Sequence, residues 1–251
     1  MWIIEILYFI YILIRLRLEI PFYSQEEYRK NVTNWCRRLM KRYNTKIYVH
    51  GKPQPGFLVP NHTSYLDPVL VLALKAGGAV AKREIKDYLL FGPIGQKLGV
   101  LWVKREKKKS RSSVIDQLNN WDAINKPLWI FPEGTTSPFG ELYPFKMGVF
   151  KAAENSGMPI QPLVFCFDNP SVDWSSNGND KDVFGSMIDF YRNKIRTNVY
   201  CFWLEPITIK PGEAKQKSDE LHAKMLKYIK RFERPRNCLL YTSDAADERN
   251  S

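Results

Sequence analysis

Short runs of β-branched and aromatic residues alternate with helical segments along most of this chain, and this alternation constrains its fold more than any other feature. The runs typical of buried strands lie at 57–59, 79–81, 100–103, 128–131, 163–165 and 199–203. Stretches with the apolar spacing of helices lie at 68–75, 112–124, 146–156 and 218–232. Strands that alternate with helices indicate an α/β fold, in which helices cover a sheet.

The N-terminus is the most apolar part of the chain. Between Trp2 and Ile14 the only charged residue is Glu5, and Pro21 ends the predicted helix. At ~1.5 Å per residue the run reaches about 20 Å, short of the ~30 Å hydrocarbon core of a bilayer. To span the bilayer, this helix would need arginines that snorkel to the interface, and a shallow membrane anchor fits the run at least as well. A helix buried in the protein core is the third possibility. No basic segment precedes the run, which argues against a signal peptide.

A second helix is predicted from Ser24, which forms a capping box with Glu27, to Asn44, a candidate C-terminal cap. Basic residues flank its apolar face, which consists of Tyr28, Val32, Trp35, Leu39, Met40 and Tyr43. Such a helix can cover a core, but its place beside an apolar run favours a position on anionic lipid. We therefore expect a two-helix membrane-docking segment at 1–44 and an α/β domain at 45–237.

The composition narrows the classes of partner. The chain carries 38 Lys and Arg against 26 Asp and Glu, a formal charge of +12, which suits a phospholipid surface, a nucleic acid or a phosphorylated substrate. Its 4 cysteines lack metal-binding spacing, which argues against a disulfide scaffold or a structural zinc site. A mean hydropathy of −0.36 excludes a polytopic membrane protein. Residues 238–251 look like the translation of a sequencing adapter, and the alternative is a genuine polar tail.

The segment Asn61–Pro68, with the sequence NHTSYLDP, directly follows a predicted strand. On a continuous helix His62 and Asp67 would lie about 140° apart, so their pairing requires a turn, which Pro68 and the Thr-Ser pair favour. Asp67 can then hold one ring nitrogen of His62 while the other faces a hydroxyl, the arrangement of a general base and its orienting carboxylate. The alternative is a structural loop histidine beside a helix cap.

Three further segments adjoin predicted strands. Phe131–Ser137 (FPEGTTS) has Gly134 for close backbone approach to a ligand, at the edge of the sheet where open α/β folds bind ligands. Gly99–Arg105 (GVLWVKR) ends in two cations that suit a phosphate. Met158–Leu163 (MPIQPL) opens the following strand. Polar and glycine residues therefore gather at strand ends.

With these four segments the sequence resembles the glycerolipid acyltransferase family of the His-x4-Asp type, which includes lysophosphatidate and other lysophospholipid acyltransferases. The resemblance rests on motifs in the family's order: the pair His62 and Asp67, the box that ends at Arg105, the Phe-Pro-Glu-Gly-Thr box, and the box at Pro159. Thr136 stands where many lysophosphatidate acyltransferases carry arginine. The family implies a mixed, mostly parallel sheet flanked by helices, with an N-terminal two-helix membrane-docking segment.

The resemblance also implies a reaction. A fatty acyl group would move from acyl-CoA or acyl carrier protein to the hydroxyl of a lysoglycerophospholipid, in the first place 1-acylglycerol 3-phosphate, at a membrane and on its cytosolic side. His62 would be the general base and Asp67 would orient it, with no protein nucleophile, metal or further cofactor. The residues implied in binding the head group are Arg105, Glu133, Gly134 and Thr135, with Lys82 and Lys146 as secondary candidates.

Other functions stay open at this point. Within the enzyme class, the acceptor alternatives are a lysophosphatidylcholine-like lipid and glycerol 3-phosphate. A non-catalytic basic module that binds membrane or nucleic acid is the other class, and the basic run Lys104–Arg111 supports it. A nucleic-acid module leaves both the His62–Asp67 pair and the apolar N-terminus unexplained, so we expect no nucleic-acid partner.

Overall fold

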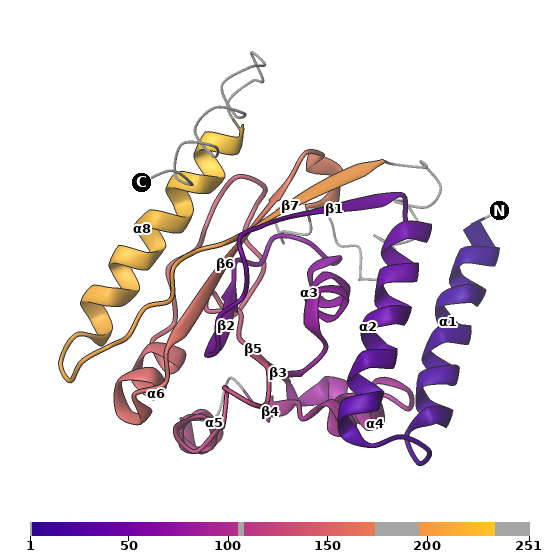
Figure 1. The fold of residues 1–251 in the computed structure, drawn as a ribbon, viewed down its shortest axis with the longest axis horizontal. Helices are drawn as coiled ribbons and strands as arrows, with labels where there is room; N and C mark the ends of the chain where they lie inside the picture. Colours follow the sequence, from indigo (N-terminus) through magenta and orange to yellow (C-terminus); the bar gives the residue numbers. More distant parts are fainter. Residues whose placement is uncertain (1, 105–107, 174–195, 234–251) are drawn as a thin grey trace.

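The computed structural model describes residues 2–104, 108–173 and 196–233, and within these residues seven strands form one sheet in the order β1-β7-β6-β2-β5-β3-β4 (Figure 1). The strands are β1 (Thr45–His50), β2 (Phe57–Pro60), β3 (Gly78–Lys82), β4 (Leu101–Val103), β5 (Leu128–Trp129), β6 (Ile160–Phe167) and β7 (Thr197–Trp203). The block from β6 to β4 is parallel, whereas β7 runs antiparallel to β6 and parallel to β1. The prediction of a mixed, mostly parallel sheet is confirmed.

Helices cover both faces of this sheet (Figure 1). One layer contains α1 (Trp2–Glu19), α2 (Gln25–Arg42), α3 (Asp67–Lys75) and α4 (Phe91–Leu98). The other contains α5 (Lys108–Asn119), α6 (Gly148–Ser156) and α8 (Ala214–Glu233). Two short 3₁₀ helices, η1 (Arg83–Asp87) and η2 (Pro170–Val172), complete the described elements.

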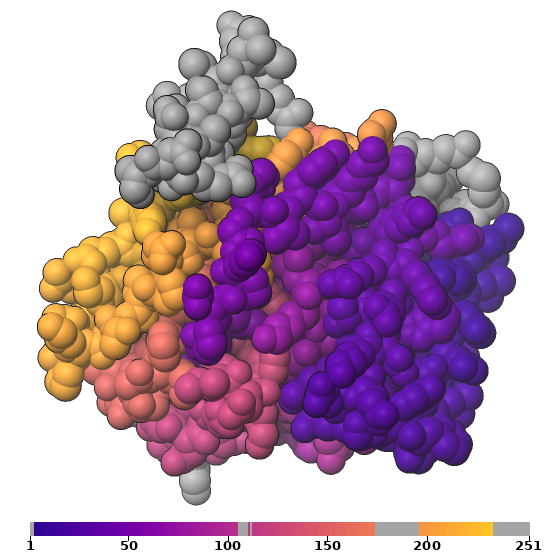
Figure 2. Space-filling model, in the orientation of Figure 1, coloured from indigo at the N-terminus to yellow at the C-terminus, as the bar shows by residue number. Residues whose placement is uncertain are grey.

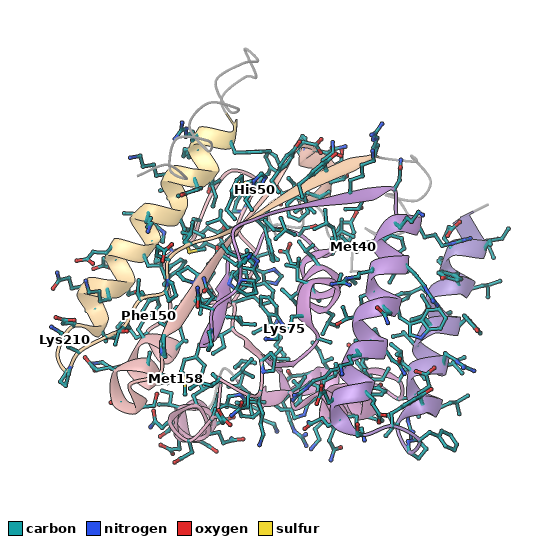
Figure 3. The ribbon with its side chains drawn as sticks, viewed as in Figure 1. Met40, His50, Lys75, Phe150, Met158 and Lys210 are labelled. Carbon is teal, nitrogen blue, oxygen red and sulfur yellow. The ribbon has the colours of Figure 1, made fainter. Side chains whose placement is uncertain are left out.

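Each face of the sheet has its own hydrophobic cluster, because side chains alternate along a strand. In β2, Leu58 belongs to the cluster beneath α1–α4, whereas Phe57 and Val59 belong to the cluster beneath α5, α6 and α8. Figure 3 labels one member of each cluster, Met40 from α2 and Phe150 from α6. The site described below lies at an edge of the sheet, between these two layers.

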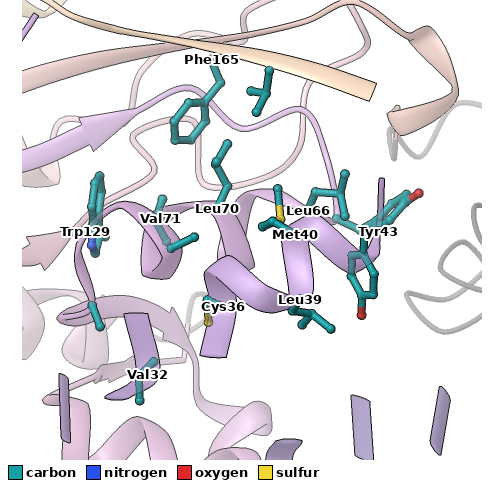
Figure 4. Packing of buried hydrophobic residues seen from close by; sticks show 14 of the residues in the cluster. Val32, Cys36, Leu39, Met40, Tyr43, Leu66, Leu70, Val71, Trp129 and Phe165 are labelled. Atoms are coloured by element: carbon teal, nitrogen blue, oxygen red, sulfur yellow. The ribbon is translucent and has the colours of Figure 1, made fainter. Parts of the chain in front are cut away.

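The apolar face of α2 is part of the core. Cys36 and Met40 are buried in the same cluster as Leu66 and Leu70, and α2 packs along α3 (Figure 4). The prediction that this face of α2 meets lipid is therefore wrong, because the sheet and α3 already occupy it. The capping box of Ser24 is confirmed: its backbone N–H donates to Glu27 Oε2 over 3.0 Å.

The termination of α2 agrees with the prediction from its sequence, and α1 has one buried face and one exposed face. Asn44 adopts a positive φ of 51° just after the helix, as its role as a terminator requires. In α1, Leu13 and Leu16 are buried, and the hydroxyl of Tyr28 donates to the Leu16 carbonyl over 3.0 Å. The opposite face of α1 is exposed and apolar, so this helix is only in part a core helix. Among the described residues, no helix has both the length and the hydropathy needed to cross a bilayer.

Candidate active site

The sheet brings the segments that contain the predicted site residues to one edge. β2, β5, β3 and β4 are neighbours and run parallel, so their carboxyl ends lie side by side. The segment with His62 follows β2, and the segment with Glu133 follows β5. Lys82 is the last residue of β3, and Lys104 directly follows β4. The strand order thus collects segments that are far apart in the chain.

His62 is paired with Asp67, as the spacing predicts. His62 Nδ1 lies 2.8 Å from Asp67 Oδ2, and the same oxygen accepts hydrogen bonds of 2.8 Å from the backbone N–H groups of Thr63 and Ser64. Asp67 opens α3 and is completely buried, while the His62 side chain is 16% exposed. Because a carboxylate oxygen only accepts, Nδ1 carries the proton and Nε2 keeps its lone pair. Nε2 can therefore accept a proton from a hydroxyl.

Phe131 restrains the plane of the imidazole. The two rings are stacked, with their centroids 4.2 Å apart and their planes 29° from parallel. Phe131 lies in the segment after β5, so the neighbouring strand supplies this wall. The ring of His62 is consequently held from two directions, at Nδ1 by the carboxylate and on one face by Phe131.

The backbone of His62 is held as firmly as its ring. Glu133 Oε1 accepts the His62 N–H over 2.7 Å, and the N–H of Ser137 donates to the His62 carbonyl over 2.7 Å. The hydroxyl of Ser137 hydrogen-bonds Glu133 Oε2, which also accepts the Tyr143 N–H over 3.0 Å. Burial, with a smaller contribution from Asp67, raises the pKa of Glu133 to about 8, although the backbone hydrogen bonds act against this shift. The loop of Glu133 and Ser137 thus fixes both polar groups of the His62 peptide.

The structure places the predicted head-group residues in different surroundings. Glu133 is only 1% exposed and its oxygens contact protein donors, which does not fit a direct contact with a head group. Gly134 has a φ of +73°, and a Cβ built there would lie 3.5 Å from Cγ of Lys146. Thr135 is exposed on the same loop, and Lys82 is exposed one strand away.

Arg105 lies outside the described residues, as does the predicted tail at 238–251. Its neighbour Lys104, which directly follows β4, is described and exposed. Among the described residues, no group of His, Cys, Asp and Glu side chains is arranged to hold a metal ion. Cys36, Cys166 and Cys201 are buried in α2, β6 and β7.

Three residues contribute to this site without having been assigned a role from the sequence. Asn61 continues β2 with its side chain: Oδ1 accepts the Phe165 N–H over 2.7 Å, and Nδ2 donates to the Phe165 carbonyl over 3.1 Å. Phe131 and Ser137 are the other two. Phe131 and Ser137 are the two ends of the FPEGTTS segment, and Asn61 directly precedes His62. A polar residue placed immediately after a buried strand is the signal that points to Asn61.

Comparison with known proteins identifies relatives of this chain. The family model "Acyltransferase" matches residues 20–166. Human 1-acyl-sn-glycerol-3-phosphate acyltransferase beta is 34% identical over 118 residues, which are 45% of this chain and 41% of the human protein. The lyso-ornithine lipid O-acyltransferase of Pseudomonas aeruginosa is 28% identical over 202 residues, 77% of this chain and 76% of that protein.

The fold also has a solved counterpart. The crystal structure of the 1-acyl-sn-glycerophosphate acyltransferase PlsC from Thermotoga maritima superposes with a TM-score of 0.60 at 20% identity, and the match covers 91% of this chain and 95% of that one. The alignment with the human relative spans well under half of that protein, and the one with the lysophospholipid acyltransferase LPEAT1 of Arabidopsis thaliana spans 32% of its length. Because the family model covers more than half of the sequence, including both segments that meet at the sheet edge, the chain belongs to the Acyltransferase family.

Proposed function

We propose that this protein transfers a fatty acyl group from a thioester, acyl-CoA or acyl carrier protein, to the free hydroxyl of a lysoglycerophospholipid. The observation that carries the proposal is the His62–Asp67 pair, with Nε2 left as a base at the carboxyl edge of the sheet. Membership of the Acyltransferase family supports the reaction class. The acceptor that we propose is 1-acylglycerol 3-phosphate, which would give phosphatidate.

His62 would act on the acceptor directly. Nε2 removes the proton of the hydroxyl as its oxygen attacks the thioester carbonyl, and a tetrahedral intermediate forms. The new C–O bond is retained, the C–S bond breaks, and the imidazolium returns the proton to the leaving thiolate. Asp67 stabilises the imidazolium during this exchange and holds the tautomer that leaves Nε2 free before it.

A phosphorylated acceptor suits the cations at this edge of the sheet. Lys82 and Lys104 are exposed at the ends of adjacent strands, and Lys146 lies beside Gly134. In our proposal, Gly134 and Thr135 approach the head group with the loop backbone, and Glu133 acts from behind by positioning His62. The proposed role of Arg105 in gripping the phosphate rests on its sequence position after Lys104.

We also propose that the exposed face of α1 docks on the membrane that contains the acceptor. Its apolar residues form one stripe, and those more than a third exposed are Ile3, Ile4, Leu7, Ile10, Tyr11, Ile14 and Leu18. A stripe of this kind in a helix that packs on the protein by its other face is typical of interfacial attachment. The helix pair occupies one whole side of the molecule (Figure 2).

An acyltransferase assay with a panel of acceptors tests the reaction. We expect thiol release from acyl-CoA to depend on a lysolipid and to be fastest with 1-acylglycerol 3-phosphate, with lysophosphatidylcholine and glycerol 3-phosphate as the competing acceptors. His62→Ala should lower kcat by a factor on the order of 10³ or more. His50→Ala is the matched control, because this histidine lies on β1 and stacks on Phe202 with ring centroids 4.7 Å apart. Undiminished turnover by His62→Ala would refute the mechanism.

A further inference from the structure

The loop between η1 and α4 exposes two large apolar side chains. Leu89 is 84% exposed, more than any other large apolar side chain among the described residues, and Tyr88 is 56% exposed. The next two residues, Leu90 and Phe91, turn inward and pack against the cluster beneath α1–α4. The loop is therefore anchored on its inner side while its tip points away from the core.

This loop packs against α1. The ring of Phe91 is 6.4 Å from that of Phe9 in α1, and the ring of Tyr88 is 6.5 Å from that of Phe91. The two segments are far apart in the chain, so only the fold brings them together. Phe9 lies on the half-buried flank of α1, and through this contact Tyr88 and Leu89 are held beside the helix that carries the exposed stripe.

The segment that leads into the loop carries an excess of positive charge. Lys82, Arg83 and Lys86 precede the tip together with the exposed Glu84 and Asp87, a net charge of +1. Within the described part of the chain none of these three cations forms an ion pair with an acidic side chain. Cations beside an exposed leucine and tyrosine have the composition of interfacial segments, in which the apolar tip enters the lipid and the cations meet head groups. Lys82 is also the end of β3, so this surface adjoins the edge of the sheet that holds His62.

We propose that Tyr88 and Leu89 form a second contact with the anionic lipid surface on which α1 docks. A single helix leaves the protein free to rotate about the helix axis, whereas two separate contacts define a plane. The loop therefore fixes the tilt of the carboxyl edge of the sheet relative to the bilayer, and with it the approach of a lipid acceptor to His62. This inference rests on the membrane docking put forward under the proposed function and adds the second point of attachment.

Vesicle sedimentation tests the contact. The full chain is mixed with vesicles of phosphatidylcholine containing phosphatidylglycerol, and the double variant Tyr88→Ser/Leu89→Ser should partition about tenfold or more weaker than the wild type. Val49→Ser is the matched control, because Val49 is 50% exposed on β1, at the opposite edge of the sheet. Leu7→Ser, in the α1 stripe, should also weaken partitioning. Circular dichroism melts identify any variant that fails to fold.

A second measurement does not depend on loss of binding. A polarity-sensitive dye on Leu89→Cys, in a Cys238→Ser background, should shift to the blue when vesicles are added, and the same dye on Val49→Cys should not. If the Leu89 variants partition like the wild type and the dye stays in water while Leu7→Ser loses binding, the loop contact is refuted and docking by α1 stands. If the wild type itself does not sediment, both are refuted, and the acyl transfer assay in detergent still tests the reaction. A wild-type dimer that the double variant converts to a monomer would show that a second copy covers the loop, which also overturns the inference.

Discussion

At the scale of single residues, the site depends on how completely His62 is restrained. Its Nδ1, one ring face, its N–H and its carbonyl each have a partner, and these partners come from two segments of the chain. In the proposed reaction a base held in this way would not have to be reoriented, which is how preorganisation lowers a barrier. The residues around His62 therefore define the geometry of the site together with the histidine itself.

Asp67→Asn tests the tautomer. An asparagine amide can donate a hydrogen bond to Nδ1, which favours the form of His62 with its proton on Nε2, so kcat should fall by a factor on the order of 10²–10⁴ while the fold is kept. Asp122→Asn serves as the control, because Asp122 lies in an exposed loop and bonds Asn125. Steady-state kinetics measure the effect, and a kcat within a factor of about two of the wild type would exclude an orienting role for Asp67.

Glu133 should make the stability of the protein depend on pH. Burial raises its pKa from 4.5 to about 8, so between these values the folded state binds the proton more tightly than the unfolded state. Its contribution to stability is complete below pH 4.5 and is lost as the pH rises through 8. Glu133→Gln removes this titration. Between pH 5 and 8 the free energy of unfolding, measured by urea denaturation, should therefore decline less in this variant than in the wild type, by on the order of 1–3 kcal/mol. Equal declines in both proteins would contradict the shift.

The pair His62–Asp67 could be predicted from the sequence because a short turn joins the two residues. The function of Glu133 could not, because its partners are backbone groups of His62 and Tyr143 that only the folded loop brings near. Its position in the Phe-Pro-Glu-Gly-Thr box indicates that Glu133 is important, but the sequence alone does not show whether its carboxyl is buried or exposed. Ser137 was missed for the same reason.

At the scale of elements, Asn61 joins β2 to β6 beyond the end of their ladder. Its side chain pairs with both backbone groups of Phe165, in the way a further residue of the strand would. Asn61→Ala leaves these groups buried without partners, so the free energy of unfolding should fall by about 2–4 kcal/mol. Chemical denaturation measures the change, and Asn155→Ala, on an exposed residue of α6, is the control. A change below about 0.5 kcal/mol would show that Asn61 does not support the sheet.

The strands and long helices could be predicted because their apolar patterns are strong, whereas two elements had no such pattern. α4 contains Gly92, Pro93 and Gly95, residues that disfavour a helix. The helix forms because it packs closely on its neighbours at positions where a side chain would not fit. A Cβ on Gly92, for example, would lie 2.0 Å from the Lys86 carbonyl oxygen. β1 has mostly exposed or half-buried residues, because it lies at the edge of the sheet. Tertiary packing, which local sequence does not contain, decides both.

At the scale of the whole molecule, the N-terminal helix pair has an inner face that covers the core and an outer face that we propose docks on the membrane. Its inner side covers Leu66 and Leu70, so a protein that lacks residues 1–43 should expose this cluster and aggregate. Light scattering and size-exclusion chromatography measure the outcome. The matched variant Ile4→Ser/Leu7→Ser/Leu18→Ser changes the outer side alone and should stay monomeric and folded while it binds vesicles less. A truncated protein that is monomeric and cooperative would show that the pair is dispensable to the core.

The pairing of β1 with β7 has a consequence for how the protein is made. Thr45 is synthesised early and its partner Thr197 late, and in the described part of the chain β7 is the strand that pairs with β1. Until β7 leaves the ribosome, β1 and the outer edge of β6 present unpaired backbone groups, which promote association between nascent chains. The residues that match the family model end before β7 begins, so this match does not mark out a unit that folds alone. Synthesis of this protein therefore includes an interval in which most of its sheet exists and its edge is still open.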